Sequence, residues 1–166
     1  MDHEYFMRIA LKAAQNALSS GEFPVGCVMV YEDRVIATGY RCGTAGMLTN
    51  EIDHAEIVAL KQLSLQSGSI DFERVTAFST LEPCLMCYGA LLIHGIGKIV
   101  YAYEDAMGGG TGCEVSKLPS LYRNARTTII PNVLRKESLR LFKAFFSNPK
   151  NSYCRGSLLA QYTMAQ

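Results

Sequence analysis

Two cysteines stand three residues apart in the segment from Pro83 to Cys87, where Cys84 and Cys87 enclose a leucine and a methionine. Residues at this spacing near the start of a helix lie on one face, so both thiols can reach a single ion. Proline is favoured in the first helical turn, and the partial positive charge at that end lowers thiol pKa toward the thiolate that zinc binds. Taken alone, the pair fits a zinc site, a redox couple or two buried small side chains.

A histidine and a glutamate form a second candidate group upstream, in the segment His54-Ala55-Glu56. Residues two apart on a helix do not face the same way, so the imidazole can bind a metal while the carboxylate lies over an open coordination position. One histidine and two cysteines supply three ligands, and catalytic zinc sites leave the fourth position to water. Two thiolates neutralise the charge of Zn²⁺, which makes a nearby base necessary. We therefore predict that His54 and the two cysteines bind zinc and that Glu56 moves protons.

Four further cysteines raise the alternatives of a fourth zinc ligand and of disulfides; they are Cys27, Cys42, Cys113 and Cys154. None lies at a spacing that would complete a structural site. The first residues, MDHEYFMRIALKAAQ, are too polar and acidic for a secretory signal, and no apolar run approaches the roughly 20 residues that cross a bilayer. We expect a cytoplasmic protein with no membrane partner, whose cysteines are thiols or metal ligands.

The length of 166 residues suffices for one hydrophobic core and is short for two. Hydrophobic residues make up 49% and charged residues 19% of the chain, which is ordinary for a folded protein and excludes a disordered one. We therefore predict one zinc-binding domain over residues 1–166.

Charges are divided unevenly along the chain. Residues 1–115 contain 7 basic and 14 acidic side chains, whereas residues 116–166 contain 9 basic side chains and 1 acidic one. A basic segment of this kind favours a polyanionic partner such as RNA. It fits equally well a solvated face, or a surface that meets an acidic patch of a second subunit. The candidate nucleic-acid contacts are Lys136, Arg140, Lys143 and Lys150.

Helical and extended patterns alternate along the chain, which is typical of an α/β sheet with parallel members. The predicted helices are an N-terminal one that Gly21 ends, 54–66, 84–94 and a basic helical region at about 132–166. The predicted strands are 26–31, 34–40, 75–79, 98–102 and 127–130, with a turn at Glu32 and Asp33. Loops fill 41–53 and the glycine-rich segment 105–112.

The segments around the candidate residues resemble a known family. They read HEYFMRIAL, FPVGCVMVYEDRVIATGY, HAEIVAL and STLEPCLMCYGALLIHGIGKIVYAYEDAMGGGTG. The pattern H-x-E, followed after 26 residues by P-C-x-x-C, matches the signature of zinc nucleobase deaminases. The chain is similar to the cytidine/deoxycytidylate deaminase superfamily over most of its length, and most closely to bacterial tRNA adenosine deaminases. A histidine as first ligand is unlike the small tetrameric cytidine deaminases, which begin with a cysteine.

The resemblance implies a cytidine deaminase-like fold, a three-layer α/β/α sandwich around a mixed five-stranded sheet, with one Zn²⁺ per chain and usually a homodimer. It also implies a pocket for the base, with candidate residues Pro24, Val25, Gly26, Arg41, Ala55, Leu81 and Glu82. In the implied reaction Glu56 takes a proton from water at the metal, and the hydroxide attacks the amine-bearing ring carbon. Glu56 then passes the proton to the ring nitrogen and afterwards to the departing ammonia.

Three features depart from the family pattern. Arg41 stands where the family usually has an asparagine that contacts the nucleoside, and the loop after it is slightly longer. Arg41 could instead meet a phosphate or a carbonyl oxygen, or face solvent. Phe145 and Phe146 match the paired phenylalanines of tRNA deaminases, but serine and asparagine follow them where the family has a basic cluster.

The leading functional hypothesis is deamination of adenosine to inosine in tRNA, at the wobble position, supported by the resemblance and the basic C-terminal segment. The enzyme alternative is a deaminase of a free base or nucleoside such as guanine or cytosine, which needs no basic face. A different class is an inactive zinc-binding scaffold, and the presence of Glu56 opposes it because a structural site does not require that carboxylate.

Overall fold

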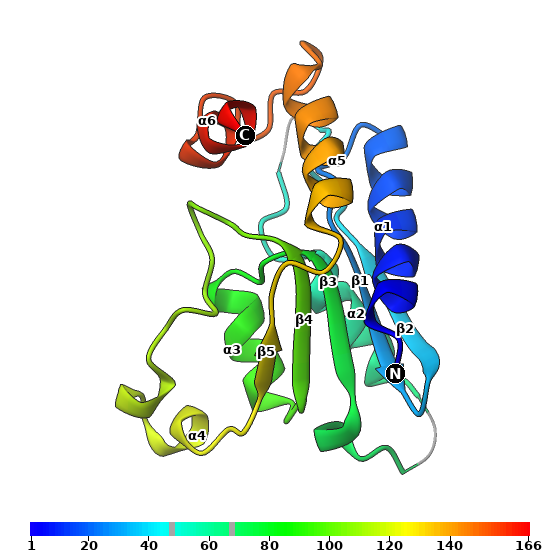
Figure 1. Ribbon diagram of the computed structural model, residues 1–166, viewed down its shortest axis with the longest axis vertical. Coiled ribbons are helices and arrows are strands. Elements are labelled where there is room, and N and C mark those ends of the chain that lie inside the picture. Colours follow the sequence, from blue (N-terminus) through cyan, green and yellow to red (C-terminus); the bar gives the residue numbers. More distant parts are fainter. Residues whose placement is uncertain (47–48, 67–68) are drawn as a thin grey trace.

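A mixed five-stranded sheet forms the centre of the computed structural model, which describes residues 1–46, 49–66 and 69–166 (Figure 1). In chain order the helices and strands are α1 (His3–Ser19), β1 (Gly26–Tyr31), β2 (Arg34–Tyr40), α2 (Ala55–Leu63), β3 (Thr76–Leu81), α3 (Leu85–Ile93), β4 (Lys98–Tyr103), α4 (Ser120–Arg123), β5 (Thr128–Ile130), α5 (Arg135–Ser147) and α6 (Leu158–Ala165). The strand order is β2-β1-β3-β4-β5. β1 pairs antiparallel with β2 and β3, whereas β3, β4 and β5 are parallel.

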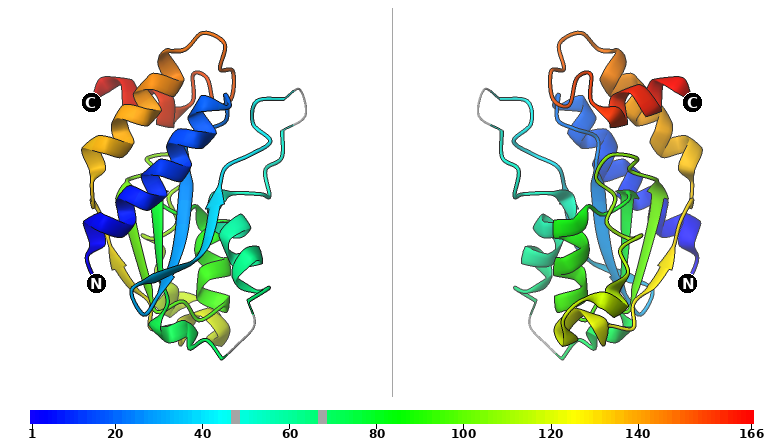
Figure 2. Two further views of the ribbon diagram at one scale, coloured as in Figure 1. Left: turned by 90° about the vertical axis from the view of Figure 1, so that its right-hand side faces the viewer. Right: turned by 90° about the vertical axis from the view of Figure 1, so that its left-hand side faces the viewer.

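Helices cover both faces of the sheet and produce three layers (Figure 2). α1 and α5 lie on one face, and α2 and α3 lie on the other. Val28 and Val30 of β1 pack with Phe6 of α1, whereas Cys27 and Met29 belong to the core on the side of α2 and α3. Because neighbouring residues of a strand point to opposite faces, β1 contributes to both cores. The predicted three-layer sandwich is confirmed.

Two glycines allow the helices to lie close to the sheet. A Cβ atom at Gly26 would lie 2.3 Å from the carbonyl oxygen of Ala10 in α1. A Cβ atom at Gly39 would lie 2.0 Å from the carbonyl oxygen of Ala55 in α2. Any larger residue would therefore push a helix away from the sheet. The contact at Gly39 fixes the start of α2, which carries the predicted proton-transfer residue.

The hairpin of β1 and β2 has the predicted bounds and the predicted turn. Glu32 and Asp33 adopt left-handed backbone angles, with φ of +49° and +55°. Two successive residues with positive φ are typical of the tight turn whose twist matches that of the flanking strands. Tyr31 pairs with Arg34 across it.

Helix boundaries differ from the prediction at two of the predicted metal ligands. His54 and Cys84 have extended backbone, with ψ of 155° and 170°, and are the N-caps of α2 and α3 rather than residues inside them. α2 also ends at Leu63 and not at 66, and β3 continues to Leu81. The region predicted as helical at about 132–166 contains α5 and α6, with a turn segment between them. None of the helices in the described ranges combines the length and apolarity needed to cross a membrane.

The loop predicted at 41–53 joins β2 to α2, and residues 47 and 48 of it lie outside the described residues. The glycine-rich loop at 105–112 follows β4, as predicted. Both loops start from β-strand ends on the side of the sheet where α2 and α3 begin, so they can contribute to one site (Figure 1).

Candidate metal centre and adjoining pocket

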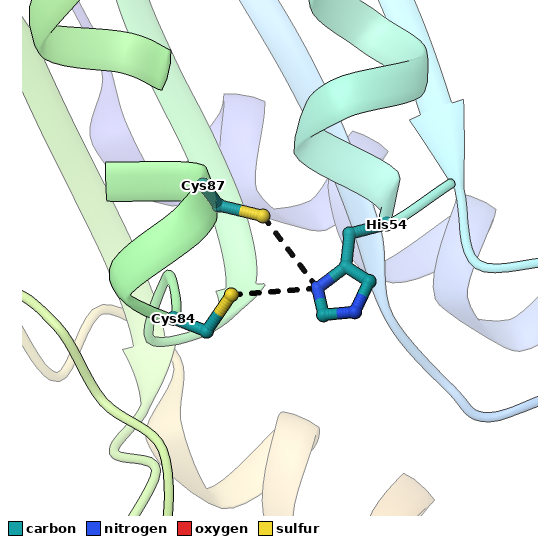
Figure 3. A group of neighbouring side chains, drawn as sticks. All are labelled: His54, Cys84 and Cys87. Carbon is teal, nitrogen blue, oxygen red and sulfur yellow. Dashed lines mark hydrogen bonds between the residues drawn. The ribbon is translucent and has the colours of Figure 1, made fainter. Parts of the chain in front are cut away.

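The structure brings the three predicted metal ligands together where α2 and α3 begin (Figure 3). His54 precedes α2, Cys84 precedes α3, and Cys87 lies in the first turn of α3. The Nδ1 atom of His54 lies 3.6 Å from the Sγ atom of Cys84 and 3.5 Å from that of Cys87. Both thiols point toward the imidazole, so the three donor atoms converge on one point.

The donor set fits a zinc ion. Tetrahedral zinc, with Zn–S bonds of about 2.3 Å and Zn–N bonds of about 2.0 Å, holds sulfur and nitrogen ligands about 3.5 Å apart. The measured separations are 3.5 and 3.6 Å. Within the ranges that the structure describes, this group contains three candidate ligands and no fourth. Three protein ligands are typical of a catalytic zinc site, where water or substrate occupies the remaining position.

The two thiols of the centre differ in their pKa. A hydrogen bond from Cys87, together with one from His54, lowers the pKa of Cys84 to about 4 against the opposing effect of burial. The same hydrogen bond and burial raise the pKa of Cys87. The start of α3 adds a partial positive charge beside both sulfur atoms. These contacts favour the thiolate at Cys84, the form that zinc binds.

Glu56 lies in the first turn of α2 with a side chain that is only 3% exposed. Ser79 of β3 donates a hydrogen bond of 2.8 Å to its Oε1 atom. Burial raises the pKa of Glu56, although the hydrogen bond from Ser79 opposes this shift. A buried carboxyl of raised proton affinity, fixed at one oxygen, is suited to accept and release protons.

A pocket of about 220 Å³ opens beside these residues, and His54, Glu56 and Cys84 line it. Most of the candidate base contacts also line it: Val25, Arg41, Ala55, Leu81 and Glu82. Pro24 and Gly26 are not among the lining residues. Gly26 instead donates its backbone N–H to Thr80 Oγ1 at 3.0 Å and packs against α1, which is a role in the sheet.

Residues that the sequence prediction missed complete the pocket. Phe23 and Glu51 contribute to its walls, the loop after β4 supplies Asp105, Met107 and Gly108, and the C-terminal segment supplies Tyr153, Cys154 and Leu159. The run of glycines predicted an unusual loop after β4 but did not indicate which part of the fold this loop contacts. Nothing in the local sequence marks the C-terminal contacts, because they depend on how the chain returns to the sheet.

The glycine-rich loop packs against the start of α3 through Glu82. The carboxylate of Glu82 accepts hydrogen bonds from the backbone of Asp105 at 3.2 Å and of Thr111 at 3.3 Å. Gly110 donates its N–H to the carbonyl oxygen before Cys84 at 2.9 Å. A Cβ atom at Gly109 would lie 2.5 Å from Glu82 Oε2, and one at Gly110 would lie 2.7 Å from the backbone of α3. The glycines therefore let the loop approach the metal residues closely.

Arg41 is buried, with only 2% of its surface exposed, so the interpretation that it faces solvent is wrong. Its Nη1 atom donates to the carbonyl oxygens of Cys42 at 2.9 Å and Asp53 at 3.2 Å. Its Nη2 atom contacts Glu51 Oε2 and the hydroxyl of Tyr153, both at 3.3 Å. Burial is tolerated because the guanidinium is paired and hydrogen bonded. Arg41 thus forms part of the pocket wall while its donors engage its own chain.

The predicted nucleic-acid contacts do not form one cluster around the pocket. Lys136 and Arg140 are exposed on α5, in the layer opposite the metal residues. Lys143 donates to the backbone carbonyl oxygen of Gln166 at 3.2 Å. Lys150 lies closer, because it lines a hollow with Tyr153 beside the pocket.

The six cysteines are all free thiols in the structure. Cys27 is fully buried in the core, and burial raises the pKa of its thiol. Cys154 lines the pocket, whereas Cys42 and Cys113 do not. The expectation that the cysteines are thiols or metal ligands agrees with this arrangement.

Comparison with known proteins places these features in a family. A model of the cytidine and deoxycytidylate deaminase zinc-binding region matches residues 1–103. The tRNA-specific adenosine deaminase of Bacillus subtilis (strain 168) is 31% identical over 143 residues, which cover 86% of this chain and 88% of that protein. The tRNA-specific adenosine deaminase of Streptococcus pyogenes serotype M18 is 29% identical, over 87% of this chain and 90% of that protein.

Solved structures give the same result at the level of the fold. One, from a study of A-to-I editing by tRNA:A34 deaminases at the wobble position of transfer RNA, has a TM-score of 0.64 and 26% identity, and the match covers 79% of this chain and 99% of that one. A guanine deaminase from Nitrosomonas europaea has a TM-score of 0.68 and 21% identity, over 86% of this chain and 83% of that one. The second likeness concerns the fold alone.

Proposed function

The chain belongs to the family of cytidine and deoxycytidylate deaminases, and on this premise we propose that it converts adenosine to inosine at the wobble position of tRNA. It is a deaminase with zinc as its cofactor. The substrate is proposed because relatives named tRNA-specific adenosine deaminase align with nearly the whole chain. Such an enzyme would work in the cytoplasm, where tRNA is used.

The pocket beside the metal residues supports deamination of a single base, and the similarity to tRNA-specific adenosine deaminases carries the proposal that this base belongs to tRNA. The pocket volume of about 220 Å³ lies below the roughly 300 Å³ at the lower end of common small-molecule sites. It therefore suits a base without its sugar. Enzymes that modify a base in a polynucleotide extrude that base from the strand into such a pocket. Phe23, Val25 and Leu81 provide apolar walls for it.

Glu56 performs the proton transfers in the proposed reaction. His54, Cys84 and Cys87 would hold zinc, which would supply an activated water for attack on the amine-bearing ring carbon. Ser79 holds Oε1 of Glu56, which leaves Oε2 to accept a proton from that water. The raised pKa of the buried carboxyl favours uptake of this proton, which Glu56 then gives to the ring nitrogen. Glu56 takes a second proton from the hydroxyl newly attached to the ring carbon and gives it to the amine, which leaves as ammonia.

The proposed tRNA contacts begin with Lys150, which lies beside the pocket. Lys136 and Arg140 are exposed on α5 and would meet phosphates farther from the reacting base. Contacts of this kind make RNA affinity fall as salt concentration rises. We expect Lys150→Ala to raise KM for tRNA and to reduce the salt dependence of binding by about one phosphate contact.

A free nucleobase is the second candidate substrate. It is favoured by the pocket volume, which has room for a base, and by Tyr153 and Cys154, which form part of the wall on the side of the C-terminal segment. The deciding experiment is mass spectrometry of zinc-loaded protein incubated with unmodified tRNA and, separately, with a panel of bases and nucleosides. Inosine in tRNA that Glu56→Ala abolishes supports the proposal; turnover confined to a small molecule contradicts it.

We also propose that the enzyme is a homodimer that pairs through α3. Leu85, Met86 and Ile93 of this helix are exposed by 61%, 37% and 53%. An apolar face of this kind is typical of an interaction site, and a second copy is the partner that the resemblance implies. Sedimentation velocity is expected to give a dimer that Ile93→Lys dissociates. A wild-type monomer at micromolar concentration would contradict this assembly.

A further inference from the structure

Two segments far apart in the sequence meet at one wall of the pocket. The first is the described part of the loop between β2 and α2, which contributes Arg41 and Glu51. The second is the turn segment between α5 and α6, which contributes Tyr153 and Cys154. Figure 2 shows this turn segment above the sheet end, next to the loop. What holds the two segments together therefore controls one side of the pocket.

Tyr153 is the residue at which the segments join. Its hydroxyl donates to Glu51 Oε2 at 2.7 Å and accepts from Arg41 Nη2 at 3.3 Å. The guanidinium carbon of Arg41 lies 5.6 Å from the centre of the Tyr153 ring, and the ring of Phe23 packs edge-on with it at 5.2 Å. Burial and the contact with Glu51 raise the pKa of Tyr153 to about 12, although the contact with Arg41 opposes this shift. The tyrosine is therefore a neutral donor at physiological pH.

Each partner of Tyr153 is itself held by its own segment. Asn50 accepts hydrogen bonds of 3.0 Å from the backbone N–H groups of Ile52 and Asp53, and this turn presents Glu51. Asn151 donates to the carbonyl oxygen of Phe145 at 3.0 Å, which ties the turn segment to the end of α5. Each segment thus has hydrogen bonds of its own, and the Tyr153 hydroxyl joins the two.

The connection can open without stranding a buried charge. Glu51 is 56% exposed, so its carboxylate can exchange Tyr153 for water at little cost. Arg41 would keep its two backbone carbonyl acceptors when the tyrosine leaves. Contacts that exchange readily with water can hold a pocket wall in place and still break when a substrate binds and the wall moves.

We propose that Arg41, Glu51 and Tyr153 form a clasp that closes the pocket wall and restricts which groups the deaminated base can carry. The inference rests on the proposed deaminase function of the pocket and concerns which substrates enter. A free base fits within the closed wall. A base that carries a sugar and an RNA strand requires the C-terminal turn segment to move. The three clasp residues are positioning residues, because they act through the wall and not on the reacting atoms.

The test uses Tyr153→Phe, which keeps the ring and its packing but removes both hydrogen bonds. Glu51→Gln is the milder companion, since it keeps an acceptor at an exposed position and does not threaten folding. The matched control is Tyr31→Phe, at a half-buried tyrosine whose ring also lies beside an arginine, Arg74 at 5.4 Å, but outside the pocket. Each zinc-loaded variant is assayed for kcat and KM on a free base, its nucleoside and an RNA stem-loop that contains it.

Loosening the clasp is expected to raise kcat/KM for RNA, relative to that for the free base, by about three- to tenfold, the value of about one net hydrogen bond. Hydrogen exchange of residues 148–157 is expected to accelerate in Tyr153→Phe and, less, in Glu51→Gln, but not in the control. Unchanged exchange, or an equal change of kcat/KM for every substrate, would overturn the clasp. If the wild-type protein deaminates no RNA, the proposed substrate is wrong. The inference is then decided by kcat/KM for the free base compared with that for its nucleoside, together with the hydrogen exchange rates.

Discussion

The carboxylate of Glu104 ties the C-terminal helices to the end of β4, and we expect it to make stability depend on pH. Arg135 at the start of α5 donates to it through Nε at 2.7 Å and also through Nη2, and the hydroxyl of Tyr162 in α6 donates at 2.7 Å. Burial raises the pKa of Glu104, but the hydrogen bonds from Arg135 and Tyr162 outweigh it and lower the pKa to about 2. Glu104 therefore remains charged in the folded protein under conditions that protonate it in the unfolded chain.

The size of the stabilisation by Glu104 follows from the difference between its pKa in the folded protein and in the unfolded chain. The pKa of Glu104 falls from 4.5 to about 2 on folding, so the carboxylate stabilises the fold above pH 4.5, and this stability is lost as pH falls toward 2. At 1.36 kcal/mol per unit the difference corresponds to about 3 kcal/mol. Both side chains are 28% exposed, and solvent screening reduces the expected contribution to about 2 kcal/mol. We expect Glu104→Gln to destabilise the protein by about this amount at pH 7 and to match wild type near pH 2.

Urea unfolding followed by circular dichroism between pH 3 and pH 7 measures the gap between wild type and Glu104→Gln. Acid also releases zinc by protonating its ligands, but this affects both proteins equally and cancels in the comparison. Glu4→Gln is the control, because Glu4 pairs with Arg8 at an exposed position where screening is strong. A gap that stayed constant from pH 7 to pH 3 would refute the linkage between Glu104 and acid stability.

Three further predictions concern the site and the sheet. Ser79→Ala removes the hydrogen bond to buried Glu56 and is expected to lower kcat about tenfold with zinc content unchanged, measured by steady-state kinetics and elemental analysis. Cys87→Ser is expected to reduce bound zinc from one ion per chain toward none and to lower the melting temperature; full zinc occupancy would show that the ligand is wrongly assigned. Gly39→Ala would place a Cβ atom 2.0 Å from a carbonyl oxygen of α2 and should cost about 3 kcal/mol in unfolding free energy, whereas Gly112→Ala meets nothing within 4 Å and should be neutral.

The metal residues could be predicted because short motifs, in which ligand residue types stand at a fixed spacing, indicate a metal site. A histidine before one helix and two cysteines at the start of another need only two helix starts to meet, and the alternation of strands and helices supplies them. The prediction put His54 inside a helix, whereas it is an N-cap. The error arose because a capping residue and a first helical residue share the same sequence pattern.

The C-terminal wall of the pocket could not be predicted in the same way. Tyr153 meets Arg41 across most of the chain length, and neither residue has a neighbour that indicates the contact. Arginine is rarely buried, so the sequence favours an exposed or ligand-binding Arg41. A buried guanidinium is tolerated only when it is paired, and the partners of Arg41 are known only from the structure.

Chemistry and access are therefore supplied by different parts of the chain. The proposed zinc ligation and proton transfer would come from the starts of α2 and α3, which are closely approached by Gly39 of the sheet and by Gly110 of the loop after β4. The wall that limits the substrate comes from the loop after β2 and from the segment before α6, which the hydrogen bonds of the Tyr153 hydroxyl join. Changes in the second group can alter substrate range, because Arg41, Glu51 and Tyr153 line the pocket and none of them is among the predicted metal ligands. Arg41 belongs to this group, so its departure from the family pattern is expected to affect which substrates enter and not how they react.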